Sequence, residues 1–519
     1  MNKKITLLAS MVLIFAGFSC KKLDKVNPSY PTVDSYFTNS AQLLSGTNAV
    51  YVSFHAGFLL GRELFYLHDM RSDEFAAGGG QLEVVRSQIL NGALSAGNTQ
   101  TSSVWNGLYI LIHRANTVIN SAPKVTDNAA LRDRCVAEAK CMRAWAYYNL
   151  VVLWGGVPMR LKPVENIEDY SPRSSVAQVY AQVIADLKDA SAVLPASYTG
   201  ADLGRMTKGG AQALLGKVYL QNGNYDLAKA EFVKVMDSKL YQLVDNYEYN
   251  FDEEHEFNKE SLMEAIYFDR GDRKYDASFT GDGAATAQTT LRTQEYNPLS
   301  WRNLIPSDKY LNEFENIATG AFKTDPRFGM SVYLTGDKYN NGATTMLDAD
   351  QNGNASIING VKIKAGWRKY TLIYKQDKAV ATKTYWGGTN YRVIRYADIL
   401  LMMAECENEL GNSTGAVAYL NQIRNRPGVA MPNYPTAQYA VDSKANVIKA
   451  LMHERMVELG AEEVRNFDIL RWRKKGYFST DPFSYFRAGR DELLPIPQDE
   501  IANNPSLGKG DVSAQNPGY

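Results

Sequence analysis

The chain has 519 residues, of which 22% are charged, and its 56 basic and 56 acidic side chains cancel to a formal charge of zero. This balance does not suggest a nucleic-acid partner, which calls for a basic patch. The length allows two or three average domains or one large one. Beyond the N-terminus, no apolar run reaches the roughly 20 residues that a membrane-spanning helix needs.

The N-terminus has the three-part layout of a secretory signal. Lys3 and Lys4 precede an apolar run from 5 to 15, and small residues then lead to Cys20. A cysteine directly after a small residue at the cleavage point resembles a lipobox, so we predict that residues 1–19 are a signal peptide and Cys20 is a lipid anchor. Cleavage would leave 519 − 19 = 500 residues with a formal charge of 54 − 56 = −2. The alternative is an ordinary signal peptide with an incidental cysteine.

Three helices are predicted in the first half of the chain, over 104–122, 131–154 and 175–194, from apolar residues at helical spacing. The second of them is closed by Gly155 and Pro158, which are typical stop signals. Cys135 and Cys141 lie six residues apart on this helix. They point about 120° apart, so we expect no disulfide between them; these two and Cys406 are predicted to be buried apolar residues.

A repeat pattern follows between 212 and 240. Its Leu215, Gly216, Tyr219, Ala228 and Phe232 fit the spacing of a tetratricopeptide unit, in which small residues let two antiparallel helices approach. A second unit fits around 403–427, and 139–150 resembles the first helix of a third. Generic helical hairpins are the alternative. Because repeats must stack to bury their faces, the pattern predicts a helical, solenoid-like layer.

Residues from about 246 to 392 form a different region. Gly, Asn, Thr, Tyr and Trp are frequent there, and helical periodicity is weak. Long insertions of this kind are usually functional or disordered, and the aromatic content argues against disorder.

Several motifs in the C-terminal third occur together in one order. They are RYADILL at 395–401 with AE at 404–405, LNQIRNR at 420–426, EEVRNFDILRW from 462 to 472, LPIP at 494–497 and QNPGY at 515–519, and WGGVP at 154–158 adds an N-terminal one. Together they resemble the SusD/RagB family of outer-membrane nutrient-binding lipoproteins. The resemblance covers nearly the whole mature chain.

The resemblance implies an all-α, tetratricopeptide-like fold in one domain over 20–519. We expect a helical scaffold over about 34–245 and 393–475, a loop-rich insertion over about 246–392 that forms the ligand face, and an extended C-terminal segment, 476–519. It further implies a protein that is lipid-anchored in the outer membrane and faces the cell exterior. Such a protein would capture a glycan or an oligopeptide and hand it to a SusC-type TonB-dependent transporter.

The charged residues of the C-terminal motifs are spaced along amphipathic helices. We predict that they pair across helices, since the guanidinium fork of arginine binds carboxylates bidentately. They are Glu405, Arg424, Glu454, Arg455, Glu458, Arg465, Asp468 and Arg471.

Signatures of catalysis are poor. The five histidines share no metal-ligand spacing, and no G-x-S-x-G or phosphate loop is present. We therefore predict a binding protein without enzyme activity and without a required cofactor. A surface glycosidase or peptidase, and a scaffold that binds protein tails in its tetratricopeptide grooves, remain the alternatives.

One candidate metal site is present. The spacing of Asp348, Asp350, Asn352 and Gly353 matches the first positions of a calcium-binding loop. The twelfth position, which should be a bidentate glutamate, is Asn359. A plain Asx-type turn is the alternative to calcium.

Aromatic residues in the insertion are the best candidates for ligand contact, because loops on a rigid scaffold collect binding groups. We predict that Trp301 and Trp386 contribute to the ligand face, with Tyr296 a weaker third. Arg71 and Asp73, in an N-terminal loop with Ser72, are a second candidate by resemblance. Three more aromatic residues, Trp367, Tyr385 and Tyr391, also fall in the insertion. The other four tryptophans, Trp105, Trp145, Trp154 and Trp472, lie on helical patterns and are predicted to be core.

Overall fold

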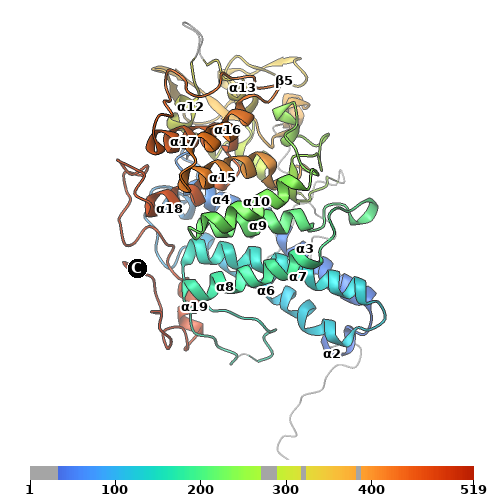
Figure 1. Ribbon diagram of the computed structural model, residues 1–519. Coiled ribbons are helices and arrows are strands. Elements are labelled where there is room, and N and C mark those ends of the chain that lie inside the picture. The colour runs from blue at the N-terminus through green and yellow to red at the C-terminus, as the bar shows by residue number, and fades with distance from the viewer. Residues whose placement is uncertain (1–32, 167, 270–288, 317–322, 382–386) are drawn as a thin grey trace, which may run out of the picture.

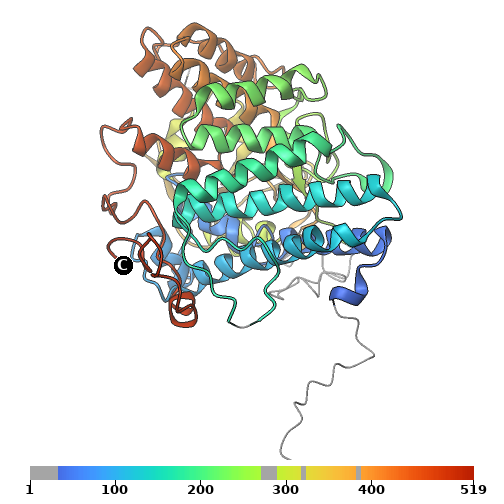
Figure 2. The same cartoon turned by 60° about the horizontal axis from the view of Figure 1, so that its bottom comes forward.

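The computed structural model describes residues 33–166, 168–269, 289–316, 323–381 and 387–519. Helices stack side by side into a layered scaffold, and loops and short strands gather at one end of it (Figures 1 and 2). The main helices are α3 (Ser40–His55), α4 (Glu63–Met70), α5 (Val84–Leu90), α6 (Thr99–Ser121), α7 (Ala129–Trp154), α8 (Val176–Val193), α9 (Lys208–Gln221), α10 (Tyr225–Asp237), α15 (Tyr396–Glu409), α16 (Ser413–Arg424), α17 (Lys444–Leu459) and α18 (Val464–Lys474).

Local signals set the ends of these helices. The side chains of Asn98, Asn128 and Thr207 accept hydrogen bonds from main-chain N–H groups in the first turns of α6, α7 and α9, which satisfies donors that have no partner within the helix. Ser175 and Gln178 form a reciprocal capping box at the start of α8. Gly155, with a φ of 74°, ends α7. The three helices predicted in this half are therefore confirmed, with bounds shifted by a few residues.

Helices α9 and α10 form the predicted antiparallel repeat. A Cβ atom on Gly216 would lie 2.4 Å from the ring of Phe232, so glycine is needed for the two helices to approach this closely. Consecutive helices pack against each other from α6 through α10, and α10 packs on α15, which packs on α16 and α17. The second predicted repeat corresponds to α15 and α16, where Ala416 and Leu420 are fully buried.

The insertion contains short elements only. In the part that is described, its strands pair as two-stranded antiparallel sheets, β4 with β9, β5 with β6 and β7 with β8, while β2 pairs with β10 and β1 with β3. The strands are β1 (Phe75–Ala77), β2 (Ser261–Ala265), β3 (Leu304–Pro306), β4 (Val332–Leu334), β5 (Lys338–Tyr339), β6 (Thr344–Thr345), β7 (Ser356–Ile358), β8 (Val361–Ile363), β9 (Ala365–Trp367) and β10 (Tyr391–Arg395). The short helices of the insertion are α11 (Arg292–Tyr296), α12 (Asp308–Glu313), α13 (Arg327–Ser331) and α14 (Lys378–Ala381). Two more short helices, α2 (Val33–Tyr36) and α19 (Gln498–Asn503), lie outside it.

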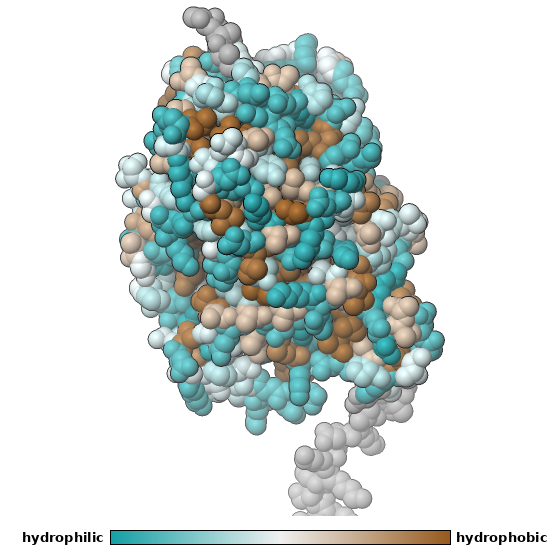
Figure 3. Space-filling model, in the orientation of Figure 1, coloured by the Kyte–Doolittle hydropathy of each residue, from teal (hydrophilic) through white to brown (hydrophobic). Residues whose placement is uncertain are grey.

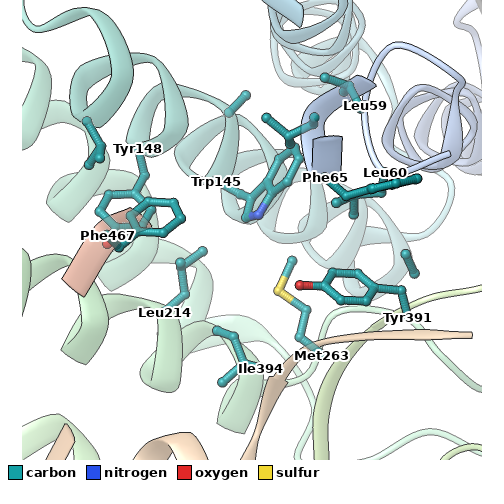
Figure 4. Close-up of a cluster of buried hydrophobic side chains, with 14 of the residues drawn as sticks. Leu59, Leu60, Phe65, Trp145, Tyr148, Leu214, Met263, Tyr391, Ile394 and Phe467 are labelled. Carbon is teal, nitrogen blue, oxygen red and sulfur yellow. The ribbon is translucent and has the colours of Figure 1, made fainter. Parts of the chain in front are cut away.

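The largest core joins the helical layer to the insertion. Figure 4 shows Trp145 and Tyr148 of α7, Leu214 of α9 and Phe467 of α18 together with Tyr391 and Ile394 of β10. The four tryptophans predicted to be core are at most 4% exposed, which confirms that prediction. On the face shown in Figure 3, hydrophilic residues are interspersed with apolar ones.

The predicted charge pairs are present and buried. Arg471 pairs with Glu405 at 2.6 Å, Arg455 with Asp468 at 2.6 Å, and Arg424 with Glu454 at 3.1 Å. Glu458 joins α17 to Arg327 of the insertion and to Arg395 at the end of β10. The Glu458–Arg327 pair therefore joins the insertion to the helical scaffold, whereas the first three pairs join scaffold helices to one another.

The C-terminal segment crosses the end of α7. The Trp154 indole N–H donates to the Pro495 carbonyl (3.0 Å), and the Leu494 N–H donates to the Leu153 carbonyl (2.7 Å). Asn516 adds a side-chain bond to the Trp154 carbonyl (2.9 Å). The LPIP motif is thus extended and lies against the helical layer, as its prolines predict.

Cys135, Cys141 and Cys406 are buried and unpaired, as predicted. Cys20 and the predicted signal peptide lie outside the described residues. Among the helices of the described ranges, none combines the length and the apolar composition that crossing a bilayer requires.

Candidate functional site

Trp301 lies on a platform formed by three segments, 75–78, 302–306 and 352–354. Strand β1 pairs with β3, and the pairing continues when the Gly78 N–H donates to the Asn303 carbonyl (2.8 Å). The third segment joins when the Asn354 N–H donates to the Gly78 carbonyl (2.6 Å). A Cβ atom on Gly78 would lie 1.7 Å from the Arg302 carbonyl oxygen, and one on Gly353 would lie 1.9 Å from the Gly78 carbonyl oxygen. Both close approaches therefore require glycine.

Arg302 holds the segments of this platform together through hydrogen bonds. Its buried guanidinium donates to the carbonyls of Asn352 (2.5 Å), Asn354 (2.9 Å) and Ala365 (2.7 Å). Burial lowers the pKa of Arg302 to about 10, because the charged form loses its hydration. The residue next to Trp301 is thus used to hold the 352–354 loop in place.

Trp301 is 41% exposed and has an arginine beside its ring. The Arg62 guanidinium carbon lies 6.0 Å from the ring centroid and is held by Glu295 (2.5 Å). Gln81 donates to the Trp301 carbonyl, and the Asn352 amide approaches the Ser300 carbonyl at 3.5 Å. A partly exposed aromatic ring with an arginine beside it can stack on an apolar ring face and bring a guanidinium to the polar groups at its edge.

The predicted role of Tyr296 is corrected. Tyr296 is 1% exposed, and its hydroxyl donates to Asp69. Its ring packs between Phe65 and Phe75, at centroid distances of 5.5 and 5.4 Å. The α11 helix turns this ring into the core, where it offers no face to a ligand.

The Arg71–Asp73 loop is also a packing element rather than an open surface. Asp73 is 7% exposed and is held by Arg465 (2.7 Å) and by Lys309. Arg71 is buried and donates to the Asp491 carbonyl (3.0 Å) in the C-terminal segment. At 8% and 7% exposed, the Arg71 and Asp73 side chains are buried and offer no open surface to a ligand, which corrects this prediction.

The remaining aromatic candidates divide further. Trp386 and Tyr385 lie outside the described residues. Trp367 is fully buried and Tyr391 is 2% exposed.

The sequence analysis did not identify Arg62 and Gln81, which lie near Trp301 in the structure. The glycine run at 78–80, directly before Gln81, was the available signal, because it marks a close backbone approach.

The residues of the proposed calcium loop do not fit a calcium ion. Asp348 faces the Lys364 ammonium at 3.3 Å and Asp350 faces the Lys378 ammonium at 2.5 Å, so lysines stand beside both carboxylates. Asn359, at the twelfth position, has a φ of 49° and turns the β7–β8 hairpin. The calcium hypothesis is thus corrected to a turn. Within the described ranges, no group of three or more His, Cys, Asp or Glu is arranged to hold a metal.

Buried carboxyls with raised pKa values lie in the core. Burial raises the pKa of Asp69 and of Glu463. Glu463 and His68 line a cavity of about 40 Å³, which has room for a few water molecules and not for a sugar ring. Neither Glu463 nor His68 therefore faces a substrate-sized space in this cavity.

The fold and the platform define a class: a helical-repeat scaffold with a loop-rich insertion that carries an exposed aromatic residue. Residues 259–519 match the sequence profile of the SusD family, and residues 26–220 match a profile described as "Starch-binding associating with outer membrane". The chain belongs to the SusD family.

Relatives and solved structures agree with this assignment. The SusD-like protein P2 of Formosa agariphila is 27% identical over 99% of both chains. A SusD superfamily protein from Bacteroides vulgatus has the same fold, with a TM-score of 0.75 and 21% identity over 93% of this chain and 100% of that one. A structure described as a laminarin-binding SusD-like protein has a TM-score of 0.72 and 25% identity, over 93% of this chain and 100% of that one.

Proposed function

We propose that this protein is a lipid-anchored binding protein on the cell exterior. It captures a glycan on the face around Trp301 and delivers it to a SusC-type TonB-dependent transporter. An oligopeptide is the second ligand class to be tested. The protein would bind its ligand without breaking or forming covalent bonds in it.

The observation that carries the proposal is the Trp301 platform. Sugar rings present C–H faces that pack on aromatic planes, while their hydroxyls need partners such as arginine and amide groups. Arg62 offers such a partner beside the partly exposed ring of Trp301, and the Gln81 and Asn352 amides lie at the main-chain carbonyls of Trp301 and Ser300. The laminarin-binding relative supports a glycan as the ligand.

Trp301→Ala should weaken binding of the glycan identified on an array by several-fold to about tenfold, since loss of one stacking ring costs about 0.5–1.5 kcal/mol beyond its area. The melting temperature should stay nearly unchanged because the ring is 41% exposed. Titration calorimetry and thermal unfolding measure the two quantities on the same preparations.

Tyr170→Ala is the matched control, since Tyr170 is 39% exposed and lies in a different loop. Equal affinities for the Trp301 and Tyr170 variants would contradict the site. Product analysis after prolonged incubation tests the hydrolase alternative, because cleavage by protein free of contaminating hydrolases would overturn the binding-protein proposal.

Cys20→Ala is expected to release the protein from the outer-membrane fraction in cells that lack the partner barrel. Several acyl chains on one cysteine hold far better than one, since each buried CH₂ contributes roughly 0.8 kcal/mol. Fractionation followed by immunoblotting measures the distribution. A variant that still sediments with outer membranes in those cells would show that Cys20 is not the anchor.

A further inference from the structure

A second cavity lies elsewhere in the insertion, around the β5–β6 hairpin labelled near the top of Figure 1. Its volume is about 380 Å³, within the range of about 300–1,000 Å³ that is usual for small-ligand sites. The segment 246–252, the turn after β5 and the segment 368–374 line it. It shares no lining residue with the Trp301 platform.

Aromatic rings form much of its wall. Tyr249 is 37% exposed, and its ring stacks on His255 with a centroid distance of 3.5 Å. Tyr333 is buried beneath the Arg368 guanidinium, which lies 4.8 Å from the ring centroid, and Tyr374 adds a further ring. The stack on His255 holds Tyr249 in place, so its exposed area is a fixed apolar surface at the cavity.

The polar groups of the wall balance in charge. Arg368 pairs with Glu248 at 2.5 Å, and both side chains are about 30% exposed, at 29% and 33%. Asp252 and Lys338 add one charge of each sign. The remaining lining charge, Lys369, is fully buried and neutralised by Glu462 at 2.8 Å. A wall with no net charge, but with donors and acceptors side by side, suits an uncharged ligand rich in hydroxyls.

The main chain holds the cavity open. Asn340, Asn341 and Gly342 have φ angles of 51°, 52° and 82°, which place the turn after β5 in the left-handed region. The Asn340 N–H donates to the Ile373 carbonyl (2.9 Å), and the Asn341 N–H donates to the Tyr374 carbonyl (2.6 Å). These bonds tie the hairpin to the opposite wall, so the site is formed before a ligand arrives.

We propose that this cavity is a second saccharide-binding site, which takes an uncharged mono- or disaccharide independently of the Trp301 platform. The sugar would lay a C–H face against Tyr249. Its hydroxyls would meet the Glu248–Arg368 pair and the Asn341 amide. The inference rests on the wall of this cavity and does not require a glycan at Trp301.

The test uses the mature protein carrying Trp301→Ala, so that the first platform cannot contribute. Maltose, cellobiose, laminaribiose and lactose are the probes, and saturation-transfer NMR with titration measures binding. We expect at least one of them to bind. Adding Tyr249→Ala should weaken that binding about two- to tenfold, and adding Tyr170→Ala, a tyrosine of similar exposure (39% against 37%), should not change it.

Asn341→Gly is a second variant, because glycine adopts the positive φ without strain and removes only the amide. It should also weaken binding with an unchanged melting temperature. The proposal is overturned if none of the four disaccharides binds the Trp301→Ala protein, or if the Tyr249 and Tyr170 variants bind equally. The glycan proposed for Trp301 is measured separately on protein with Trp301 intact, so either site can fail without the other.

Discussion

Glu458→Gln is expected to lower the free energy of unfolding by about 3–5 kcal/mol, the usual cost of breaking a buried ion pair from one side. Glu458 is completely buried and accepts hydrogen bonds from Arg426 (2.7 Å), Arg395 (2.8 Å) and Arg327 (3.1 Å). The neutral amide removes the negative charge that compensates these buried guanidiniums, so their positive charge is left partly uncompensated. Urea unfolding at pH 7, followed by tryptophan fluorescence, measures the change.

The sign of the pH dependence follows from the pKa of Glu458. Burial alone would raise this pKa, but Arg426, Arg395 and Arg327 outweigh burial and hold it well below its usual range. The stabilisation is therefore complete above the unfolded pKa of about 4.3 and is lost as the pH falls below it. The difference in the free energy of unfolding between wild type and the Glu458→Gln variant should therefore become smaller at acidic pH.

Lys140→Met is the control for an exposed pair. Lys140 and Asp189 lie 2.7 Å apart, but their side chains are 24% and 60% exposed. Solvent screens such pairs, so the expected cost is below about 1 kcal/mol. Similar costs for the Glu458 and Lys140 variants would mean that the buried network does not hold the insertion on the scaffold.

Raising the pH from about 6.5 to 9 should remove roughly 3 kcal/mol of stability that depends on His453, at about 1.4 kcal/mol per pKa unit. His453 lies in α17 between Glu313 (3.0 Å) and Glu315 (3.2 Å), and its side chain is completely buried. Burial alone would lower its pKa, but the two carboxylates outweigh burial and raise it to about 9. A raised pKa means that the stabilisation is complete below about 6.5 and is lost as the pH rises through about 9.

His453→Gln isolates this effect from other groups that titrate in the same range. Glu256, for example, has a pKa raised to about 7, mainly by burial. Subtracting the stability of the variant from that of the wild type at each pH removes such contributions. The difference should be largest near pH 6 and decline toward pH 9. Parallel stability curves for the two proteins would contradict a charged His453 in the folded state.

Much of the scaffold follows from sequence alone, because helices are specified by local patterns. Periodic apolar residues, the caps at Asn128 and Ser175 and the stop at Gly155 lie within a few residues of the elements they define. The small Gly216 opposite Phe232 is also a short-range signal, so the tetratricopeptide hairpin could be recognised. The charges of α17 and α18 were correctly predicted to pair, since arginine and carboxylate at helical spacing have few other buried solutions.

Which aromatic residues are exposed on the insertion could be decided only by the tertiary structure. Trp301 and Trp367 have similar sequence surroundings, yet one is 41% exposed and the other fully buried, because burial depends on contacts with distant segments. Tyr296 is taken into the core by Phe65 and Phe75, more than 200 residues earlier in the chain. Lys378 likewise reaches Asp350 from 28 residues away and turns an apparent calcium loop into an ion pair. The sequence by itself determined the helical class and the family, whereas the folded chain decided which rings are exposed and which charges are paired.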